Sequence, residues 1–211
     1  RHLRPVFVRK VVDIIRSKGG EPFLFDTVAN YPGSRASKKK YLDTAGRNGF
    51  VEASVNASVV IADDADELQA IPIRKPIEGC ELKEIKVASR LLKPPFLVVL
   101  SHVKGHELTG FGGALKNLGM GCVSTQTKRA QHCVNMPIFA EERDCSGCGK
   151  CADACPTKAI TLENEKPRRA SAECIYCGTC FFICSSHCWI WPPGSKEKLQ
   201  VYLGHAASAV L

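Results

Sequence analysis

The sequence lacks any apolar run long enough to cross a membrane. One of its longest, Phe96–Leu100, is far shorter than the roughly 20 residues that a membrane-spanning helix needs. The chain also lacks low-complexity segments, and it shows no apolar leader of the kind found in secretory signal peptides. Apolar residues make up 45% of its 211 residues, which excludes a disordered chain. We expect a folded cytoplasmic protein with one ordinary domain and a smaller second one.

Disulfides are a poor explanation for the twelve cysteines of this chain. Disulfide frameworks are typical of secreted chains of fewer than about 100 residues that lack a core of their own. Here, eight of the twelve cysteines are crowded between Cys145 and Cys184. We therefore expect a reducing compartment and a metal cofactor held by these eight thiolates.

The crowded cysteines form an internal duplication. The pattern C-x-x-C-G-x-C-x-x-x-C occupies residues 145–155 and recurs 29 residues later, at residues 174–184. Three thiolates at i, i+3 and i+6 on a tight loop can hold three corners of an iron–sulfur cube, and the glycine permits turns close to the sulfides. The fourth cysteine of such a run ligates the neighbouring cube. The duplication therefore predicts two [4Fe–4S] clusters.

Each predicted cluster takes one ligand from the opposite run. The first set is Cys145, Cys148, Cys151 and Cys184, and the second set is Cys174, Cys177, Cys180 and Cys155. Zinc is the alternative cofactor, but two cysteine pairs closing one tetrahedron would use four of the eight thiols. The region resembles the bacterial-type two-cluster ferredoxins. Ser185 departs from that family, which usually has proline there, but proline at this position shapes a turn and ligates nothing.

The duplication also predicts which residues pack beside the clusters. Shifted back by 29 positions, Cys188 corresponds to Ala159 and Trp189 to Ile160. We therefore expect Cys188 to be a buried small side chain rather than a ninth ligand. Five large apolar residues are expected to shield the cubes from water: Phe181, Phe182, Trp189, Ile190 and Trp191.

The charge distribution argues against nucleic-acid binding. The formal net charge is +8, and all of the excess lies in residues 1–139, which contain 21 basic and 13 acidic residues. An oxidised cube with four thiolates carries roughly −2, so two of them bring the net charge to about +4. The run Lys38–Lys40 is typical of a solvated helix face.

The first two-thirds of the chain predicts a layered α/β domain, because helical and strand patterns alternate there. Helices are predicted at Arg9–Lys18, Ser37–Gly49 and Ala114–Leu118. Strands are predicted at Pro22–Asp26, Ser58–Asp63, Ile71–Arg74, Ile85–Ala88 and, most strongly, Phe96–Leu100. We expect the α/β domain to cover residues 1–136 and a small α+β domain of the two-cluster ferredoxin type to cover residues 137–211.

The glycine-rich segment at residues 101–122 is a second candidate site, because ligands of α/β sheets bind beyond the carboxyl ends of strands. One interpretation is an anion or carboxylate site, with lysines supplying charge and a histidine acting as acid, base or metal ligand. The alternative is a structural loop whose histidines cap backbone groups. Known phosphate fingerprints do not fit. The candidate catalytic residues are His102, Lys104, His106, Lys116 and Asn117.

Other residues of the segment and its surroundings gave weaker predictions. A metal pair formed by His102 and His106 is disfavoured, because Gly105 argues against a helix between them. Three residues either face the clusters or pack in a core: Cys122, His132 and Cys133. The sequence identifies no partner for Cys80.

The chain resembles the uncharacterised iron–sulfur-centre proteins called domain of unknown function 362. The resemblance is carried by Lys104–Cys122, Gln131-His132, Pro137 and the doubled cysteine run, with further matches at Arg4-Pro5, Gly19-Gly20, Phe25–Thr27 and Gly49-Phe50. It implies an α/β domain with a C-terminal ferredoxin part, in anaerobic or facultative prokaryotes, and sequence missing before Arg1. It implies no particular reaction. Cys133 replaces the small hydroxyl residue expected at that position.

Three hypotheses about function follow. The leading one is one-electron transfer by two [4Fe–4S] clusters, to a redox partner protein or to a ligand held by the His102–Asn117 loop. The second is an anion-binding or redox-sensing module whose clusters are structural. The third is a cluster-fed oxidoreductase with a small anionic substrate. Whether the chain is itself an enzyme stays open at this stage.

Overall fold

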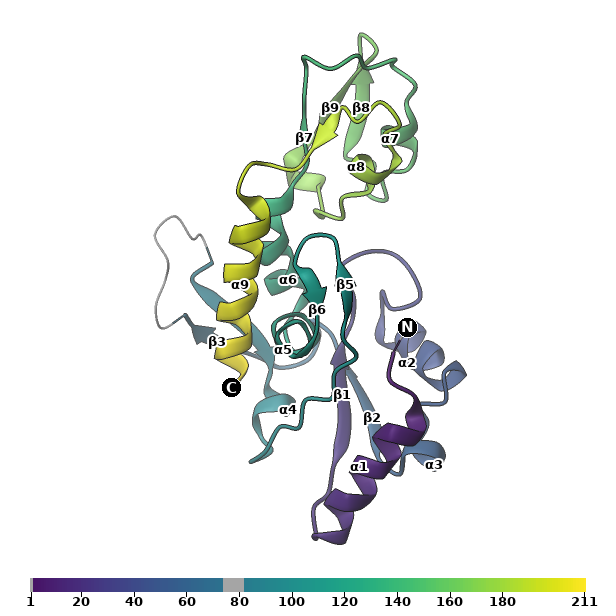
Figure 1. Cartoon of the computed structure of the whole chain (residues 1–211), viewed down its shortest axis with the longest axis vertical. Helices are drawn as coiled ribbons and strands as arrows, with labels where there is room; N and C mark the ends of the chain where they lie inside the picture. The colour runs from purple at the N-terminus through teal and green to yellow at the C-terminus, as the bar shows by residue number, and fades with distance from the viewer. Residues whose placement is uncertain (1, 74–81) are drawn as a thin grey trace.

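The computed structural model describes residues 2–73 and 82–211, which form a mixed α/β fold with five two-stranded sheets (Figure 1). Two regions are visible. We call residues 137–194, at the top of Figure 1, the lobe, and the rest of the described chain the body. In the described ranges, no helix is long and apolar enough to cross a bilayer. Arg74 and Cys80, both named above, lie outside the described residues.

The first half of the body is built on a parallel strand pair. It contains α1 (Pro5–Ser17), β1 (Phe23–Thr27), α2 (Lys38–Arg47), α3 (Glu52–Val55) and β2 (Ser58–Ala62). Pro5 starts α1, Val8 and Val12 are buried one turn apart, and Gly19 ends the helix region with a φ of +81°. β1 and β2 pair in register from Phe23 opposite Ser58. The helices and strands predicted in this part are confirmed.

The second half of the body holds the larger core. It contains β3 (Leu68–Pro72), β4 (Glu84–Ala88), α4 (Ser89–Leu92), β5 (Lys104–His106), β6 (Gly110–Gly112), α5 (Ala114–Gly121), α6 (Thr125–His132) and a 3₁₀ turn (Cys133–Asn135). β3 and β4 pair antiparallel, as do β5 and β6. Ile85, Val87 and Val123 are fully buried between these elements and α9 (Ser195–Val210).

The strand predicted most strongly, at Phe96–Leu100, is wrong. Residues 96–100 pair with no other strand of the described chain, and Phe96 is 86% exposed. The β-branched and aromatic residues there satisfy β propensity, but propensity describes how well a side chain fits a sheet that is already paired. Val99 and Leu100 instead pack against two different core clusters of the body.

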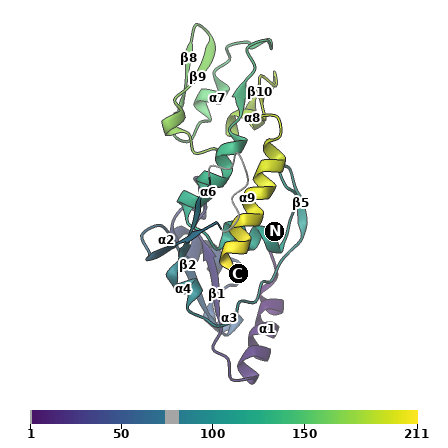
Figure 2. The same cartoon turned by 90° about the vertical axis from the view of Figure 1, so that its left-hand side faces the viewer.

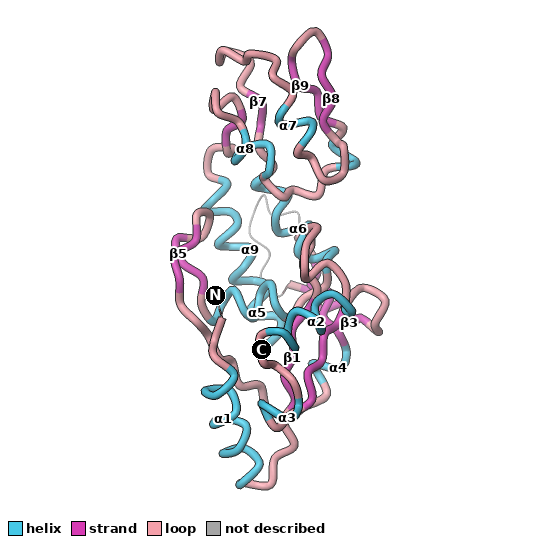
Figure 3. The backbone as a smooth tube through the Cα atoms, turned by 90° about the vertical axis from the view of Figure 1, so that its right-hand side faces the viewer, coloured by secondary structure: helices cyan, strands magenta, loops and turns pink. Residues whose placement is uncertain are grey.

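The lobe consists mainly of loops joined by short elements, as Figure 3 shows. These are β7 (Ile138–Phe139), α7 (Lys150–Asp153), β8 (Ile160–Glu163), β9 (Lys166–Arg169), a 3₁₀ turn (Ser171–Glu173), α8 (Thr179–Ile183) and β10 (Trp189–Ile190). Both strand pairs, β7–β10 and β8–β9, are antiparallel. The pairing of β7 with β10 brings the two ends of the lobe together.

The C-terminal helix α9 leaves the lobe and packs in the body. Figure 2 shows it running from the lobe down beside α6, and it packs most extensively on α5. Thus the last part of the predicted ferredoxin-type region, 137–211, contributes to the core of the body through Tyr202 and Ala206.

The approach of α5 to α9 depends on a glycine. A Cβ atom added at Gly119 would lie 2.6 Å from Leu203 Cδ1 and 2.7 Å from the Leu203 carbonyl oxygen. We expect G119A to lower the free energy of unfolding by about 1–3 kcal/mol, because the backbone of α9 must move. G204A in α9 is the matched control: an added Cβ there meets no described atom within 4 Å. That variant should be about 0.5–1 kcal/mol more stable, since alanine favours a helix. Denaturant unfolding of both variants measures the difference, and equal effects would contradict the packing argument.

Candidate metal centres

The duplication seen in the cysteine pattern is repeated by the backbone of the lobe. Left-handed residues recur 29 positions apart, with φ between 52° and 75°, in the pairs Gly147 and Tyr176, Gly149 and Gly178, and Lys158 and His187. The hydrogen bonds repeat as well. Lys158 N–H donates to the Cys155 carbonyl at 3.2 Å, and His187 N–H donates to the Cys184 carbonyl at 3.1 Å. Equivalent cysteines therefore lie on loops of the same local shape.

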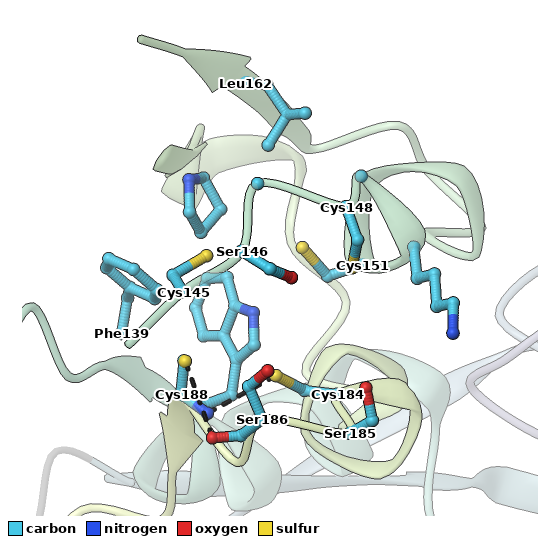
Figure 4. A pocket seen from close by; sticks show the side chains of 15 residues that line it. Phe139, Cys145, Ser146, Cys148, Cys151, Leu162, Cys184, Ser185, Ser186 and Cys188 are labelled. Carbon is cyan, nitrogen blue, oxygen red and sulfur yellow. Dashed lines mark hydrogen bonds between the residues drawn. The ribbon is translucent and has the colours of Figure 1, made fainter. Parts of the chain in front are cut away.

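A first pocket brings together the four cysteines of the first predicted set. Cys145, Cys148 and Cys151 line it from one run and Cys184 lines it from the other. Figure 4 shows Cys145, Cys151 and Cys184 directed into the same hollow from different parts of the chain. The hollow has about 390 Å³ of empty space, part of it open to solvent. We call this set the first centre.

A second pocket brings together the other four. Cys174, Cys177 and Cys180 line it from the second run, and Cys155 reaches it from the first. Its empty space, about 340 Å³ with part open to solvent, is close to that of the first pocket. We call this set the second centre. In each pocket, then, the fourth cysteine stands with the triplet of the opposite run.

The sulfurs border hollows rather than converge on one point. Among residues 2–73 and 82–211, no three His, Cys, Asp or Glu side chains are grouped closely enough to hold a metal ion. A tetrahedral zinc site would need sulfurs about 2.3 Å from one common ion. A cube is larger and takes one thiolate at each of its iron corners, so a set of four cysteines around a hollow suits it better.

Backbone N–H groups are directed at several of these sulfurs. The Lys150 N–H lowers the pKa of the Cys148 thiol. Burial raises the pKa of Cys155, but hydrogen bonds from Thr157 and other residues of the following turn outweigh it, so that pKa is lowered. The Cys188 N–H donates to Cys184 Sγ at 3.3 Å. Such donors stabilise negative charge on sulfur, whether as a thiolate or as a cluster ligand.

Burial has the opposite effect at two other positions. It raises the pKa of the Cys180 thiol to about 12 and also raises that of Cys151. Buried thiols with raised pKa values are poor nucleophiles, which makes a hydrolytic or redox-thiol role for them unattractive. Metal binding removes the proton and supplies the missing charge compensation.

A half-buried cation lies at the second centre. Arg169 lines that pocket, and its Nε is buried with no hydrogen-bond partner in the described part of the chain. An unpaired buried guanidinium nitrogen is costly unless an anion lies near it. A cube with four thiolates is such an anion, with a charge of roughly −2. The residues present therefore fit the expected cofactor in both donor set and charge.

The expected shield is present in part. Trp189 is 2% exposed and lines the first pocket, and Phe181 stacks on Trp191 with ring centroids 4.5 Å apart. Phe182 differs from the expectation, because it is 62% exposed. The ring of Phe182 contacts the ring of Trp191 edge to face. Cys188 is 1% exposed, so it is buried as expected, although it also lines the first pocket.

The candidate residues of the 101–122 loop are not all brought together. His102 is exposed, and Asn117 donates to the Leu100 carbonyl and to Ser101 Oγ, each at 2.9 Å, which places it in a structural role. His106 Nδ1 accepts hydrogen bonds from the N–H groups of Leu108 and Thr109. His106 therefore caps two backbone N–H groups, as the structural alternative predicted.

The remaining ring nitrogen of His106 faces a lysine. Its Nε2 contacts Lys116 Nζ. Because Nδ1 accepts from the backbone, the proton of the neutral ring is on Nε2, so this ring nitrogen has no free lone pair for the Lys116 ammonium. Burial, together with the cations Lys104 and Arg35, lowers the pKa of Lys116 to about 8. Lys116 thus lies among like charges.

A cluster of polar side chains at the carboxyl end of β1 was not predicted from the sequence. Tyr41 donates to Asp26 Oδ2 at 2.5 Å, and Lys128 Nζ donates to Thr27 Oγ1 at 2.6 Å and to the Val28 carbonyl. Burial lowers the pKa of Lys128 to about 8, although Asp26 opposes this effect. The sequence signal was a polar Asp-Thr pair at the end of an apolar strand, but Lys128 is 101 residues away from Thr27 and carried no signal of its own.

The other singled-out residues are packing residues of the body or its edge. Burial lowers the pKa of His132 to about 4 and raises that of Cys122 to about 12. Cys133 Sγ lies 3.0 Å from the Ala130 carbonyl. Both cysteines thus lie in the body, outside the two pockets of the lobe.

The body and the second centre touch through the loop that follows β1. Asn30 Nδ2 donates to the carbonyl of Ile175 at 3.0 Å, and Arg129 Nε donates to Asn30 Oδ1 at 2.7 Å. Ile175 lines the second pocket. The second centre is therefore the one next to the body.

Comparison with protein families settles membership. The model of the family described as Domain of unknown function (DUF362) matches residues 1–179. The chain belongs to this family. No curated protein and no solved structure matches it. The match covers the body except α9, covers the whole first cysteine run, and ends inside the second run.

The environment of Lys116 has a measurable consequence for this DUF362 protein. Its pKa is about 8 when folded, against an ordinary 10.5, so the unfolded chain binds more protons between these two values. The stability of the wild type relative to K116M should therefore rise as the pH rises from about 8 to 10.5, and be lowest near pH 7. Denaturant unfolding at several pH values measures this difference. K93M, which removes an exposed lysine, should show no such trend. A pH-independent difference for K116M would contradict the assignment.

Proposed function

We propose that this protein transfers single electrons through two [4Fe–4S] clusters, one held by each centre. The observation that carries the proposal is the lining of the two pockets, in which each run contributes three cysteines to one pocket and its fourth to the other. A duplicated run of this spacing with exchanged fourth ligands is typical of two-cluster bacterial ferredoxins. The clusters would supply one-electron chemistry, and the electrons would come from or go to a redox partner protein.

The residues around the two centres suit this role. The backbone N–H groups at Cys148 and Cys155 stabilise negative charge on sulfur, which shifts the potential of a bound cluster. Trp189 closes the first pocket on one side and limits the access of water. The raised pKa values of Cys151 and Cys180 disfavour free thiol chemistry as an alternative use of these residues.

A pair of neighbouring cysteines tests the ligand sets. Anaerobically purified wild type should contain about eight iron and eight acid-labile sulfide atoms per chain, as two cubes require. C184S should lose about half of both and keep the paramagnetic signal of one cluster after reduction. C188S, four residues away at the same pocket, should keep the full iron and sulfide content.

Two results would count against the proposal. One is equal loss of iron in C184S and C188S, since that would remove the distinction between ligand and packing cysteine. The other is clusters that cannot be reduced and reoxidised reversibly, followed by electron paramagnetic resonance, since such clusters would be structural.

A second candidate function is the binding of a small oxyanion by the loop beside α5. The observation that favours it is the environment of Lys116, where the neighbouring charged groups are the cations Lys104 and Arg35. Like charges near a half-buried lysine destabilise the fold unless an anion compensates for them. A carboxylate or phosphate with two or more oxygens would do so, and it would lie in the body that contacts the second centre.

Inorganic phosphate is a direct probe of this site. At constant ionic strength set with chloride, phosphate should raise the unfolding temperature of the wild type and of K93M, because a ligand of the folded state stabilises it. It should raise that of K116M much less. The same phosphate effect in all three proteins would exclude Lys116 from an anion site, and it would leave the proposal for the cysteines unaffected.

A further inference from the structure

The two centres differ in the charged side chain at their walls. Lys150 lines the first pocket and is exposed, whereas Arg169 lines the second and is half-buried. Water and salt screen an exposed charge, so the field of Lys150 at its pocket is weak. The charge of Arg169 is screened less, because much of its surroundings is protein.

The guanidinium of Arg169 is held in place. One of its terminal nitrogens, Nη1, donates to the Pro137 carbonyl, and its central carbon lies 5.2 Å from the centre of the Trp189 ring. Trp189 is a wall of the first pocket. The cation thus lines the second pocket and packs on an indole ring that also lines the first.

The duplication does not reproduce this charge. Arg169 pairs with Ile160 in the β8–β9 sheet, and Phe139 pairs with Trp189, the residue 29 positions after Ile160, in the β7–β10 sheet, so Phe139 is the structural equivalent of Arg169. The backbone of the two runs is equivalent, but the first pocket is lined by the uncharged phenyl ring of Phe139 at the position where Arg169 lines the second. The difference is thus one of side chain and not of fold.

The two centres also differ in what surrounds them. Cys148 of the first centre is exposed to solvent. The loop of the second centre is tied to the body by the hydrogen bond from Asn30 to Ile175. A partner protein can reach Cys148 of the first centre directly, whereas the loop of the second centre contacts the body.

We propose that Arg169 makes the second centre the electron acceptor of the pair, so that electrons enter at the first centre and move towards the body. This inference rests on the proposed function. A low-potential one-electron donor protein would lose one electron to the first cluster, which would then pass it to the second. The first step would oxidise the donor and reduce the first cluster, and the second would oxidise the first cluster and reduce the second, each by one electron and with no proton transfer. Reduction adds a negative charge, which the fixed cation stabilises, so the second potential is raised.

The experiment is a redox titration of the full chain with both clusters loaded, followed by electron paramagnetic resonance. C155S identifies the second centre, because an oxygen ligand in place of sulfur alters the spectrum of that cluster. In the wild type, the identified centre should have the higher midpoint potential. R169Q should lower that potential and change the other much less.

R168Q is the matched control. Arg168 is the neighbouring residue, it is exposed, and it pairs with Glu141 and Glu163 at the surface. Both potentials should be unchanged in R168Q. If R169Q fails to load its second cluster, R169K keeps the charge and should keep the second centre at the higher potential.

Several results would overturn the inference. These are a higher potential at the first centre of the wild type, equal shifts in R169Q and R168Q, or a fully loaded R169Q with unchanged potentials. Each of them requires both clusters to be present. A wild type without iron and sulfide is a different outcome, because it would overturn the proposed function itself.

Discussion

The exchange of the fourth cysteine between two equivalent runs is the constraint on which the lobe depends. Because Cys155 stands with the second triplet and Cys184 with the first, neither run can complete its set without the other. The apolar core that holds the runs together is small, with Ile160, Cys180 and Trp189 as its buried members. A region with so few buried residues needs additional links. Eight metal–thiolate bonds across the two halves would supply them, and in that case folding of the lobe and cluster binding are coupled.

The body supports this arrangement from outside the lobe. α9 begins just after the lobe ends, but its buried face, with Leu199 and Tyr202, packs on the body. The antiparallel β7–β10 pair joins the start and end of the lobe directly above it. Together with the hydrogen bond from Asn30, these links attach the lobe at its two ends and at the second centre. The β7–β10 pair also contributes to the first centre, because Phe139 and Trp189 line its pocket.

The features that could be predicted from the sequence depend on residues close together in the chain, whereas those that could not depend on residues far apart. The cysteine sets follow from spacings of three and four residues, and the left-handed glycines at 149 and 178 follow from the same motif. α1, β1 and β2 were predicted because helix stops and apolar runs are local signals too. The failure at Phe96–Leu100 has the opposite cause. A strand requires a partner, and whether one is available is decided by distant parts of the chain.

The same limit applies to the polar group of the body. Asp26, Tyr41 and Lys128 come together from three separate elements, so no short pattern contains them. The loop at 101–122 was identified because its histidines, lysines and glycines are close in sequence, yet tertiary structure decides their roles. Asn117 and one nitrogen of His106 serve the backbone, whereas Lys116 is left among cations. The composition of the loop indicated a candidate site, but only the fold shows which of its residues are structural and which are candidates for binding.

The two cysteine runs have the same backbone shape but different surroundings, which suggests how a duplicated unit can favour one direction of electron transfer. Two identical cube sites in identical surroundings would have equal potentials, and electrons would have no preferred site. If the two loops have the same shape but different side chains around them, the two potentials can differ without any change in the ligand geometry. Under the proposal above, a single side chain on β9 would be enough, since Arg169 lines the second pocket while the uncharged Phe139 on β7 lines the first at the equivalent position. The ligand set and the potential can therefore vary independently, because the first depends on loop shape and the second on charges just outside it.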